Sequence, residues 1–299
     1  RMLSILIPTY NYNIEALVAE LHAQSTACKI NFEILCYDDG STNLELIAAN
    51  KSIDELKNTT YKVLDSNIGR SAIRNLLAKD ANYDLLLFLD ADVIPVKDDF
   101  ISKYITAFTE STQLIFGGVN YQDKKPNNEE MLRWVFGRKR EVVPLNERKK
   151  SVYLSFLSCN FLIKKDVFNS VNFNEEISLD AHEDLLFSFN LKENDIAISH
   201  INNPIYHLGL ESSEIYLKKS LKGVKASLSL VKNNLIHIEY TRIIRTFHNC
   251  KKIGVNFLLA LLFPVFKNSF ETNLLSKKPS LFIFDLYKLS YLCYISKNE

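Results

Sequence analysis

The sequence contains few of the residues that interrupt regular structure. Its 299 residues include only 8 glycines and 7 prolines, and no repeat or low-complexity tract is present. Apolar residues make up 47% of the chain, which is typical of an ordered globular protein. A chain of this length forms one large domain, or one domain with an appendage.

Cysteine is scarce as well, and its spacing indicates no bridges. The five cysteines are odd in number and show neither a CxxC pair nor the Cys/His spacing of a zinc site. They are Cys28, Cys36, Cys159, Cys250 and Cys293. We therefore expect buried free thiols in a reducing cytosol instead of a disulfide framework.

Long apolar segments are also absent. The longest apolar run, FLLALLFPVF at 257–266, has about half the length of a bilayer-crossing helix. The apolar start MLSILIP runs directly into the polar stretch TYNYN, so we predict no signal peptide. The expectation is a cytoplasmic protein that is soluble or lies on the inner face of the cell membrane.

The charges are unevenly distributed, although the formal net charge is only +1. Residues 1–215 contain 22 Lys and Arg against 31 Asp and Glu, whereas residues 216–299 contain 14 against 4. An acidic part followed by a basic part indicates two different tasks. We predict one domain at 1–215 and a basic helical region at 216–299.

Short β-rich runs alternate with helical patterns through the first half of the chain. We predict strands at 3–8, 32–37, 60–65, 85–90 and 114–120, and helices at 14–24, 44–56 and 70–79. The run LLLFLD at 85–90 is almost entirely apolar, as expected for a strand covered on both faces. This alternation predicts an α/β fold with a mostly parallel, Rossmann-like central sheet flanked by helices.

The second half is less regular. Residues 124–150 carry nine Lys and Arg, four Asp and Glu, and the only tryptophan, and form either a solvated helix-loop excursion or a mobile cover. One or two strands and a helix start are predicted at 152–168, and a helix at 182–194. Short strands then follow, and the pattern is helical after Glu211.

Three polar clusters fall where predicted strands end, which is where ligands gather in α/β sheets. In LDAD, Asp90 and Asp92 follow a buried strand, and two neighbouring carboxylates repel unless a cation compensates them. Such hard oxygen ligands suit Mg²⁺ or Mn²⁺, with a diphosphate supplying further oxygens. The alternative is an exposed turn with an Asp cap.

The other clusters have two readings each. Asp38 and Asp39 in YDDGST can accept hydrogen bonds from a nucleobase or ribose, or form an ordinary Asp-Gly turn. Gly69, Arg70 and Arg74 open a helix, which makes either a diphosphate site or a surface helix with two arginines.

Two later features also carry possible chemistry. Glu183 and Asp184 begin a helix, where carboxylates either stabilise the helix dipole or act as a general base. His207 follows a short strand, and is either a packed histidine or a ligand that completes an aspartate-based metal site.

Taken together, these stretches resemble the family 2 glycosyltransferases, which are inverting enzymes of the GT-A fold. The ordered matches are IPTYN at 7–11, DDGST at 38–42, NIGRSAIRN at 67–75, LDAD at 89–92, CNFLIKKDVF at 159–168 and HEDLLFSF at 182–189. The resemblance covers about residues 3–210. It implies a GT-A catalytic domain that binds a nucleotide sugar through about 1–120 and an acceptor through about 120–215.

The resemblance also implies roles for individual residues. The nucleotide-binding residues would be Pro8, Thr9, Tyr10, Asp38, Asp39, Asn67, Gly69, Arg70, Arg74, Asp90 and Ala91. Among them, Asp39 would grip the base, Arg70 would contact the diphosphate and Asp90 would lie near the ribose. Asp92, with His207, would hold the divalent cation, Mn²⁺ or Mg²⁺. Asp184 would be the catalytic base, with Glu183 beside it.

The implied activity is transfer of a hexosyl or N-acetylhexosaminyl group from a nucleoside diphosphate sugar, with UDP as the expected nucleotide. The acceptor would be a hydroxyl of a glycan or lipid-linked glycan, in surface polysaccharide biosynthesis. The chain departs from the processive synthases of this family, because it lacks their QxxRW signature and their transmembrane segments. Addition of one sugar per visit is therefore expected.

The alternatives are a sugar nucleotidyltransferase and a non-catalytic nucleotide-sugar-binding module. The first normally has a Gly-rich basic loop after strand one, which IPTYNYN is not. The second would have a disabled base position, yet Glu183 and Asp184 are present. No nucleic-acid-binding motif accompanies the basic region. That region either packs as a helical subdomain or docks on anionic lipid.

Overall fold

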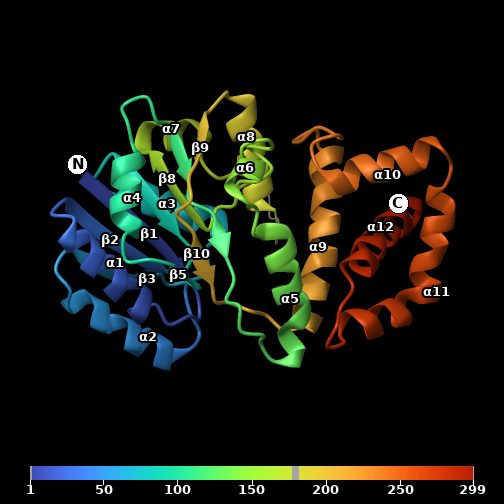
Figure 1. Ribbon diagram of the computed structural model, residues 1–299, viewed down its shortest axis with the longest axis horizontal. Helices are drawn as coiled ribbons and strands as arrows, with labels where there is room; N and C mark the ends of the chain where they lie inside the picture. Colours follow the sequence, from blue (N-terminus) through green and yellow to red (C-terminus); the bar gives the residue numbers. More distant parts are fainter. Residues whose placement is uncertain (1, 177–181, 299) are drawn as a thin grey trace. The chain divides into compact units, whose positions relative to one another are not determined.

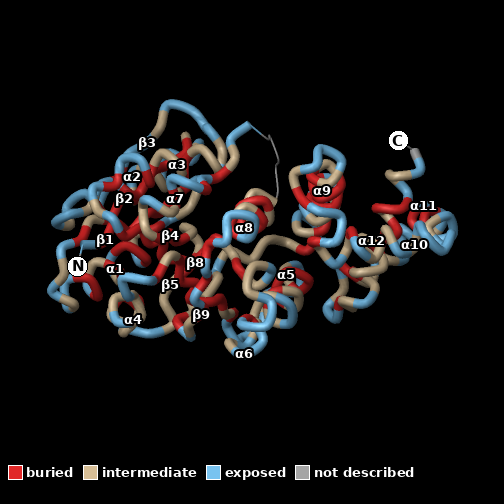
Figure 2. The backbone as a smooth tube through the Cα atoms, turned by 90° about the horizontal axis from the view of Figure 1, so that it is seen from above, coloured by how far each residue is buried: buried red, intermediate tan, exposed pale blue. Residues whose placement is uncertain are grey.

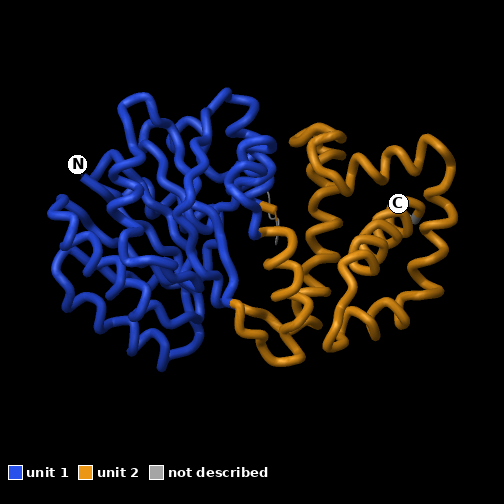
Figure 3. The backbone as a smooth tube through the Cα atoms, viewed as in Figure 1, with its two compact units in different colours: residues 1–122, 142–177, 183–209 blue, residues 123–141, 178–182, 210–299 orange. Residues whose placement is uncertain are grey.

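The computed structural model describes residues 2–176 and 182–298. The chain divides into two compact units (Figure 3). Unit 1 comprises residues 1–122, 142–177 and 183–209, and unit 2 comprises residues 123–141, 178–182 and 210–299. The basic helical region that the sequence predicts therefore shares its unit with a segment from the middle of the chain.

A seven-stranded sheet forms the centre of unit 1 (Figure 1). Its strand order is β3 (Thr59–Val63), β2 (Asn31–Asp38), β1 (Met2–Thr9), β4 (Leu85–Leu89), β8 (Asn160–Lys164), β6 (Leu114–Phe116) and β9 (Ile198–His200). The first four strands are mutually parallel, and only β8 runs antiparallel to its neighbours. The predicted α/β fold with a mostly parallel sheet is confirmed.

Helices flank this sheet in unit 1. They are α1 (Glu15–Ala27), α2 (Leu44–Asn50), α3 (Arg70–Asp80), α4 (Phe100–Ala107), α6 (Leu145–Arg148), α7 (Lys165–Val171) and α8 (Glu183–Glu193). Asn43 begins α2 because its side-chain oxygen accepts hydrogen bonds from the backbone N–H groups of Glu45 and Leu46. Residues 51–55 continue α2 as a 3₁₀ helix, so the predicted single helix at 44–56 is two segments.

A small second sheet carries part of the candidate site. Its strands are β5 (Val93–Pro95), β10 (Ile205–His207) and β7 (Val119–Asn120), in that order. In the antiparallel pairing of β10 with β5, His207 lies opposite Val93, the residue that follows Asp92. The pairing thus brings His207 close to Asp92, which lies 115 positions earlier in the sequence.

One predicted strand differs from what forms. The single strand predicted at 114–120 is two strands in different sheets, β6 and β7, separated at Gly117 and Gly118. A Cβ atom at Gly117 would lie 2.4 Å from the carbonyl oxygen of Asn203, so only glycine fits at this position. Residues 152–168 contain one strand, β8, and the start of α7, in agreement with the prediction of one or two strands and a helix start.

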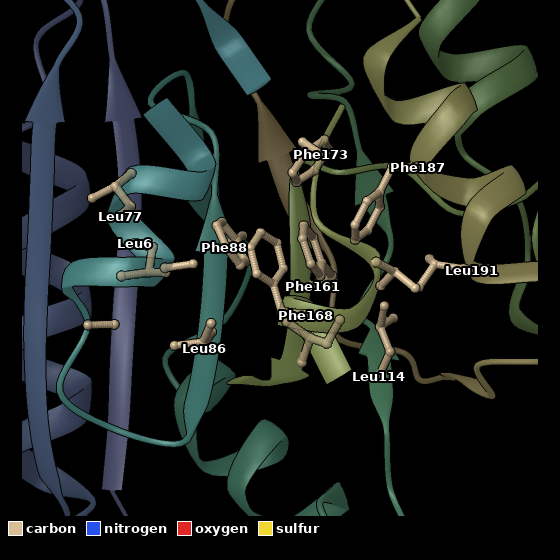
Figure 4. Packing of buried hydrophobic residues seen from close by; sticks show 14 of the residues in the cluster. Leu6, Leu77, Leu86, Phe88, Leu114, Phe161, Phe168, Phe173, Phe187 and Leu191 are labelled. Atoms are coloured by element: carbon tan, nitrogen blue, oxygen red, sulfur yellow. The ribbon is translucent and has the colours of Figure 1, made fainter. Parts of the chain in front are cut away.

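Aromatic side chains fill the core between the sheet and α8 (Figure 4). Phe88 of β4 stacks on Phe161 of β8 with ring centroids 4.8 Å apart. Phe187 of α8 stacks on Phe173 with centroids 4.2 Å apart, and both rings are 1% exposed. Burying rings of this size fixes α8 against the sheet, and with it the carboxylates at its first turn.

Buried polar side chains connect the two sheets. Asn160 is fully buried at the start of β8, and its Nδ2 donates to the carbonyl oxygens of Gly118 (2.9 Å) and Asn203 (3.0 Å). Arg148 is 4% exposed and donates to the carbonyl oxygens of Gly117 (3.4 Å) and Ile201 (2.9 Å). These bonds satisfy backbone groups in the segments that lead from one sheet to the other.

Unit 2 is helical. It consists of α5 (Met131–Phe136), α9 (Ser213–Lys232), α10 (Arg242–Lys252), α11 (Asn256–Leu274) and α12 (Leu281–Asn298), with short 3₁₀ and π turns at 128–130 and 137–141. One cluster joins Val224, Ile244, Ala260 and Leu292, and another joins Leu132 of α5 to Phe263 and Tyr287. The predicted helical C-terminal extension is confirmed.

The basic segment at 124–150 was predicted as either a solvated excursion or a mobile cover, and part of it is buried. Met131, Leu132, Arg133 and Trp134 are all buried, and Leu132 belongs to the core of unit 2. The buried guanidinium of Arg133 pairs with Glu141 at 3.1 Å. The five cysteines are free, as predicted, and Cys36, Cys159 and Cys293 are buried.

Within the described ranges, no single helix is long and apolar enough to cross a membrane. The pair α10 and α11, bent by 117° at their junction, reaches that length and composition together.

The buried side chain of His200, at the end of β9, should make the free energy of unfolding depend on pH. Burial lowers the pKa of His200 to about 4, against 6.5 for the ordinary side chain. The unfolded chain therefore binds a proton that the folded chain does not, and stability falls as the pH drops from 6.5 toward 4. The loss between pH 7.5 and 5.5 should be about 1.4 kcal/mol.

Urea unfolding of the wild type and of His200→Gln at both pH values measures this effect. The glutamine keeps a donor for the carbonyl oxygen of Val152, which His200 Nε2 contacts at 3.0 Å, but does not titrate. The variant should lose about 1.4 kcal/mol less than the wild type over this range. Equal losses in the two proteins would show that His200 does not govern this transition.

Candidate active site

The predicted site residues lie in unit 1, at the ends of β1, β2, β4 and β10 and at the starts of α3 and α8. Strands β2, β1 and β4 are parallel neighbours, so their carboxyl ends meet at one rim. At the end of β1, Pro8 is half-buried, Thr9 is buried and Tyr10 is 48% exposed. Tyr10 therefore presents a ring to solvent beside the carboxylates of β2.

Asp38 serves the loop that follows β2. It is 1% exposed, and its two carboxylate oxygens accept from the backbone N–H of Ser41 (2.7 Å) and the hydroxyl of Tyr61 (2.6 Å). Burial and this hydrogen bond raise the pKa of Tyr61, so the phenol stays protonated as the donor. Asp38 holds the DDGST loop in place.

Asp39 serves the loop that precedes α3. Its two carboxylate oxygens accept from the backbone N–H groups of Ile68 (2.7 Å) and Gly69 (3.0 Å). Gly69 has a φ of 92°, in the left-handed region that favours glycine. Gly40 also needs to be glycine, since a Cβ there would lie 2.8 Å from the backbone nitrogen of Asn67. Asp39 thus joins two loops that the sequence assigns to the nucleotide.

Asn11, the last residue of the IPTYN match, links the first two loops, a role that was not predicted from the sequence. Its backbone N–H donates to Ser41 Oγ (2.7 Å), and its side-chain oxygen accepts from the backbone N–H groups of Thr42 (2.9 Å) and Asn43 (3.0 Å). Its φ is 48°. Asparagine tolerates this backbone better than most residues, so the Asn that ends IPTYN was the available signal.

Arg74 connects the LDAD segment to the start of α8. It is 5% exposed, its Nη2 donates to Asp90 Oδ1 at 2.8 Å, and its Nη1 lies 3.5 Å from Glu183 Oε1. The sequence predicts a diphosphate contact for Arg74, whereas the structure places its guanidinium between two carboxylates. Arg70 lies on the exposed side, with 66% of its side chain accessible, and its Nη1 is 3.5 Å from the same Glu183 oxygen.

The two arginines determine the charge of Glu183. Burial raises the pKa of Glu183, but the positive charges of Arg74 and Arg70 outweigh burial, and the net pKa lies below its usual value. Glu183 is therefore ionised at neutral pH. The next residue, Asp184, is half-buried in the first turn of α8, and its Oδ1 accepts from the backbone N–H of Leu185 at 2.8 Å.

Asp92 and His207 lie side by side across the small sheet. Asp92 Oδ2 is 3.6 Å from His207 Nε2, and the carbonyl oxygen of Asp92 accepts from the backbone N–H of Leu208 at 2.7 Å. A Cβ atom at Gly209 would lie 2.0 Å from Asp92 Oδ2. Because Gly209 has no side chain, it leaves space for the carboxylate of Asp92, and nothing in the stretch IYHLG indicated this role.

The carboxylates of LDAD face different partners. Asp90 pairs with Arg74, whereas Asp92 lies against His207, the residue that the resemblance places with it on the cation. His207 stacks on Tyr121 with centroids 5.5 Å apart, and its buried Nδ1 has no hydrogen-bond partner within the described residues.

The donor set fits a cation that is bound together with a substrate. Among the residues that the structure describes, no three His, Cys, Asp or Glu side chains form a group able to hold a metal. Mg²⁺ and related ions are commonly bound by one or two protein ligands, with phosphate oxygens and water completing the shell. Asp92 with His207 provides two such ligands.

Comparison with known proteins gives a family. The model of "Glycosyl transferase family 2" matches residues 4–171, which is more than half of the chain. A chondroitin synthase of Pasteurella multocida is 30% identical over 118 residues, which cover 39% of this chain and 12% of that protein. An uncharacterized glycosyltransferase of Haemophilus influenzae is 22% identical over 303 residues, covering 96% of this chain and 90% of that protein.

The chain matches only part of the first curated relatives. The matched segments cover between 12% and 47% of the length of four of these proteins.

Two solved structures share the fold. S. aureus TarS 1–349 in complex with UDP is 20% identical, with a TM-score of 0.53 and coverage of 100% of this chain and 91% of that one. The mannosyltransferase PcManGT from Pyrobaculum calidifontis, in complex with GDP-Man and Mn²⁺, is 11% identical, with a TM-score of 0.62 and coverage of 99% and 86%. The α/β core matches these GT-A structures. On its sequence match and its fold, the chain belongs to glycosyl transferase family 2.

Proposed function

We propose that this glycosyltransferase moves a sugar from a nucleoside diphosphate sugar to a hydroxyl group of a glycan or lipid-linked glycan, with inversion at the anomeric carbon. The observation that carries the proposal is the ion-paired array of Asp90, Arg74 and Glu183. This array brings the LDAD segment close to the first turn of α8, which supports a site where donor and base meet.

A UDP-sugar is the proposed donor, and a hexosyl or N-acetylhexosaminyl residue is the proposed group transferred. The related fold of TarS has been solved with UDP and with UDP-GlcNAc, and that of PcManGT with GDP-Man. In this chain, Tyr10 offers an exposed ring for stacking on a base, and Arg70 offers an exposed guanidinium for a diphosphate.

The proposed base is Asp184. It takes the proton from the acceptor hydroxyl as that oxygen attacks the anomeric carbon, while the bond to the diphosphate breaks on the opposite face. Glu183 stays ionised and holds the first turn of α8 through Arg74 and Arg70. Asp92 and His207 would hold a divalent cation, which when bound supplies positive charge to the leaving diphosphate.

We further propose that the reaction takes place in the cytoplasm, at the inner face of the cell membrane, in surface polysaccharide biosynthesis. A lipid-linked acceptor would be presented there. Release of nucleoside diphosphate from UDP-, GDP- and dTDP-sugars, with and without glycan acceptors, tests the proposal. If the protein releases no nucleoside diphosphate from any of these donors, the proposed activity is contradicted.

The Asp184→Asn variant should lose at least 100-fold in transfer rate, because general-base assistance is typically worth about 10²–10⁴-fold. Donor affinity should stay within about two-fold, since the carboxylate acts on the acceptor. The measurements are UDP release with the preferred sugar donor and UDP binding by titration calorimetry. Asp195→Asn is the matched control, because Asp195 is exposed beyond the end of α8 and asparagine tolerates its φ of 52°. Wild-type turnover in Asp184→Asn would remove Asp184 from the mechanism.

Chelation should abolish turnover, and added Mn²⁺ or Mg²⁺ should restore it. Asp92→Ala should show the same loss without rescue, and His207→Ala should need at least ten times more metal, since a lost ligand weakens the site. Asp98→Ala is the control, because Asp98 is an exposed carboxylate in the loop after β5. Full turnover in excess EDTA would contradict the assignment of a cation to Asp92.

The Arg74–Asp90 pair should be strongly coupled, because each partner is left uncompensated when the other is removed. In a double-mutant cycle with Arg74→Gln and Asp90→Asn, the coupling energy in urea unfolding should be about 1–3 kcal/mol. The exposed pair Lys150–Glu147 is the control and should give less than about 1 kcal/mol. Equal coupling in the two pairs would show that Arg74 does not organise the site.

A further inference from the structure

The helix α11 is apolar on two faces, only one of which belongs to the core of unit 2. Ala260, Phe263 and Leu274 point into that core, with exposures of 7% or less. Phe257, Leu258, Leu261 and Val265 lie on the other side of the same helix, at exposures of 58%, 66%, 55% and 69%. A helix that is apolar all round is normally covered on all sides, so this second face indicates a docking surface.

The turn between α10 and α11 extends this face. Ile253 is 73% exposed and Val255 is 37% exposed. Together these two residues and the four on α11 make up what we call the apolar corner, and Figure 2 draws this part of the chain largely in the exposed colour. The corner is local, because the later residues on the same side of α11 are polar: Asn268, Ser269 and Thr272 are all exposed.

Positive charge borders the apolar corner. Arg242, Arg245, Lys251 and Lys252 of α10 are exposed, and we call them the basic flank. Residues 241–270 contain these four and Lys267, but no Asp or Glu. In the described part of the chain, none of the four side chains in the flank makes an ion pair. By contrast, Lys218 and Lys219 of α9 each lie 2.7 Å from a glutamate oxygen.

We propose that the apolar corner and the basic flank dock unit 2 on a membrane surface that contains anionic lipid. Apolar side chains of this kind enter the boundary between headgroups and acyl chains, while neighbouring cations bind the lipid phosphates. The unpaired positive charge of the basic flank favours an anionic lipid surface over a purely apolar partner. The inference rests on the proposed location at the inner face of the membrane, but it is independent of the proposed sugar transfer, because the surface contains none of the residues of the candidate active site.

Vesicle sedimentation tests the proposal with the whole chain and no substrate. The wild type should bind vesicles of phosphatidylcholine and phosphatidylglycerol in equal parts at least ten times more strongly than vesicles of phosphatidylcholine alone. Binding to the mixed vesicles should fall as salt rises, since the flank acts through screened charge. A wild type that stays in the supernatant with both vesicles would overturn the proposal, whatever its transferase activity.

Three variants assign the binding to this surface. The double variant Phe257→Ser/Leu261→Ser should lower the partition coefficient on mixed vesicles at least ten-fold. The triple variant Arg242→Gln/Arg245→Gln/Lys252→Gln should lower it at least ten-fold and remove most of its salt dependence, because these cations bind the lipid phosphates. Phe282→Ser is the matched control, because Phe282 is 75% exposed on α12 outside the corner, and this variant should bind as the wild type does.

Two outcomes would contradict the assignment. If the double variant binds the mixed vesicles as tightly as the wild type, or if Phe282→Ser loses as much, the apolar corner is not the docking site. If the wild type self-associates in gel filtration and the double variant dissociates with unchanged vesicle binding, the corner joins two copies of the chain. Circular dichroism of each variant confirms that these exposed substitutions leave the helices folded.

Discussion

The buried guanidinium of Arg74 is the interaction on which the candidate active site depends. A charge that is 5% exposed is stable only when opposite charges and hydrogen bonds compensate its lost hydration. Asp90 and Glu183 provide that compensation, and they come from segments 93 residues apart. The end of β4 and the start of α8 must therefore lie together whenever Arg74 is buried. The ring of Phe173, 5.3 Å from the guanidinium carbon, closes the remaining side.

Packing makes that arrangement rigid. Phe173 also stacks on Phe187, and Phe187 belongs to the same cluster as Phe88 of β4, so one aromatic core supports both sides of the ion pair (Figure 4). On the other side of LDAD, the pairing of β5 with β10 positions Asp92 against His207. The two carboxylates of LDAD thus have separate partners, although they lie only two residues apart.

The sequence predicted the fold class and the polar clusters at the strand ends, but not the contacts that the individual residues make. Strand ends are readable because apolar runs stop at polar residues, and DDGST and LDAD fall at such ends. The residues that contact them cannot be predicted from the sequence, since those partners lie far away in the chain. Nothing near Asp38 indicates that Tyr61 donates to it, and nothing near Gly209 indicates that Asp92 needs its space. The buried α5 was missed because its charges resemble those of a solvated helix.

The charges of the rim bear on the proposed cation. Asp38, Asp39, Asp90, Asp92, Glu183 and Asp184 bring six formal negative charges, whereas Arg70 and Arg74 bring two positive ones. Arg74 already pairs with both Asp90 and Glu183, so these carboxylates neutralise its positive charge and leave none for a diphosphate. A nucleoside diphosphate adds more negative charge, and in a partly buried site this repulsion is poorly screened. A divalent cation beside Asp92 would make the local charge positive at the position proposed for the diphosphate. The proposed metal therefore has an electrostatic reason that does not depend on any sequence motif.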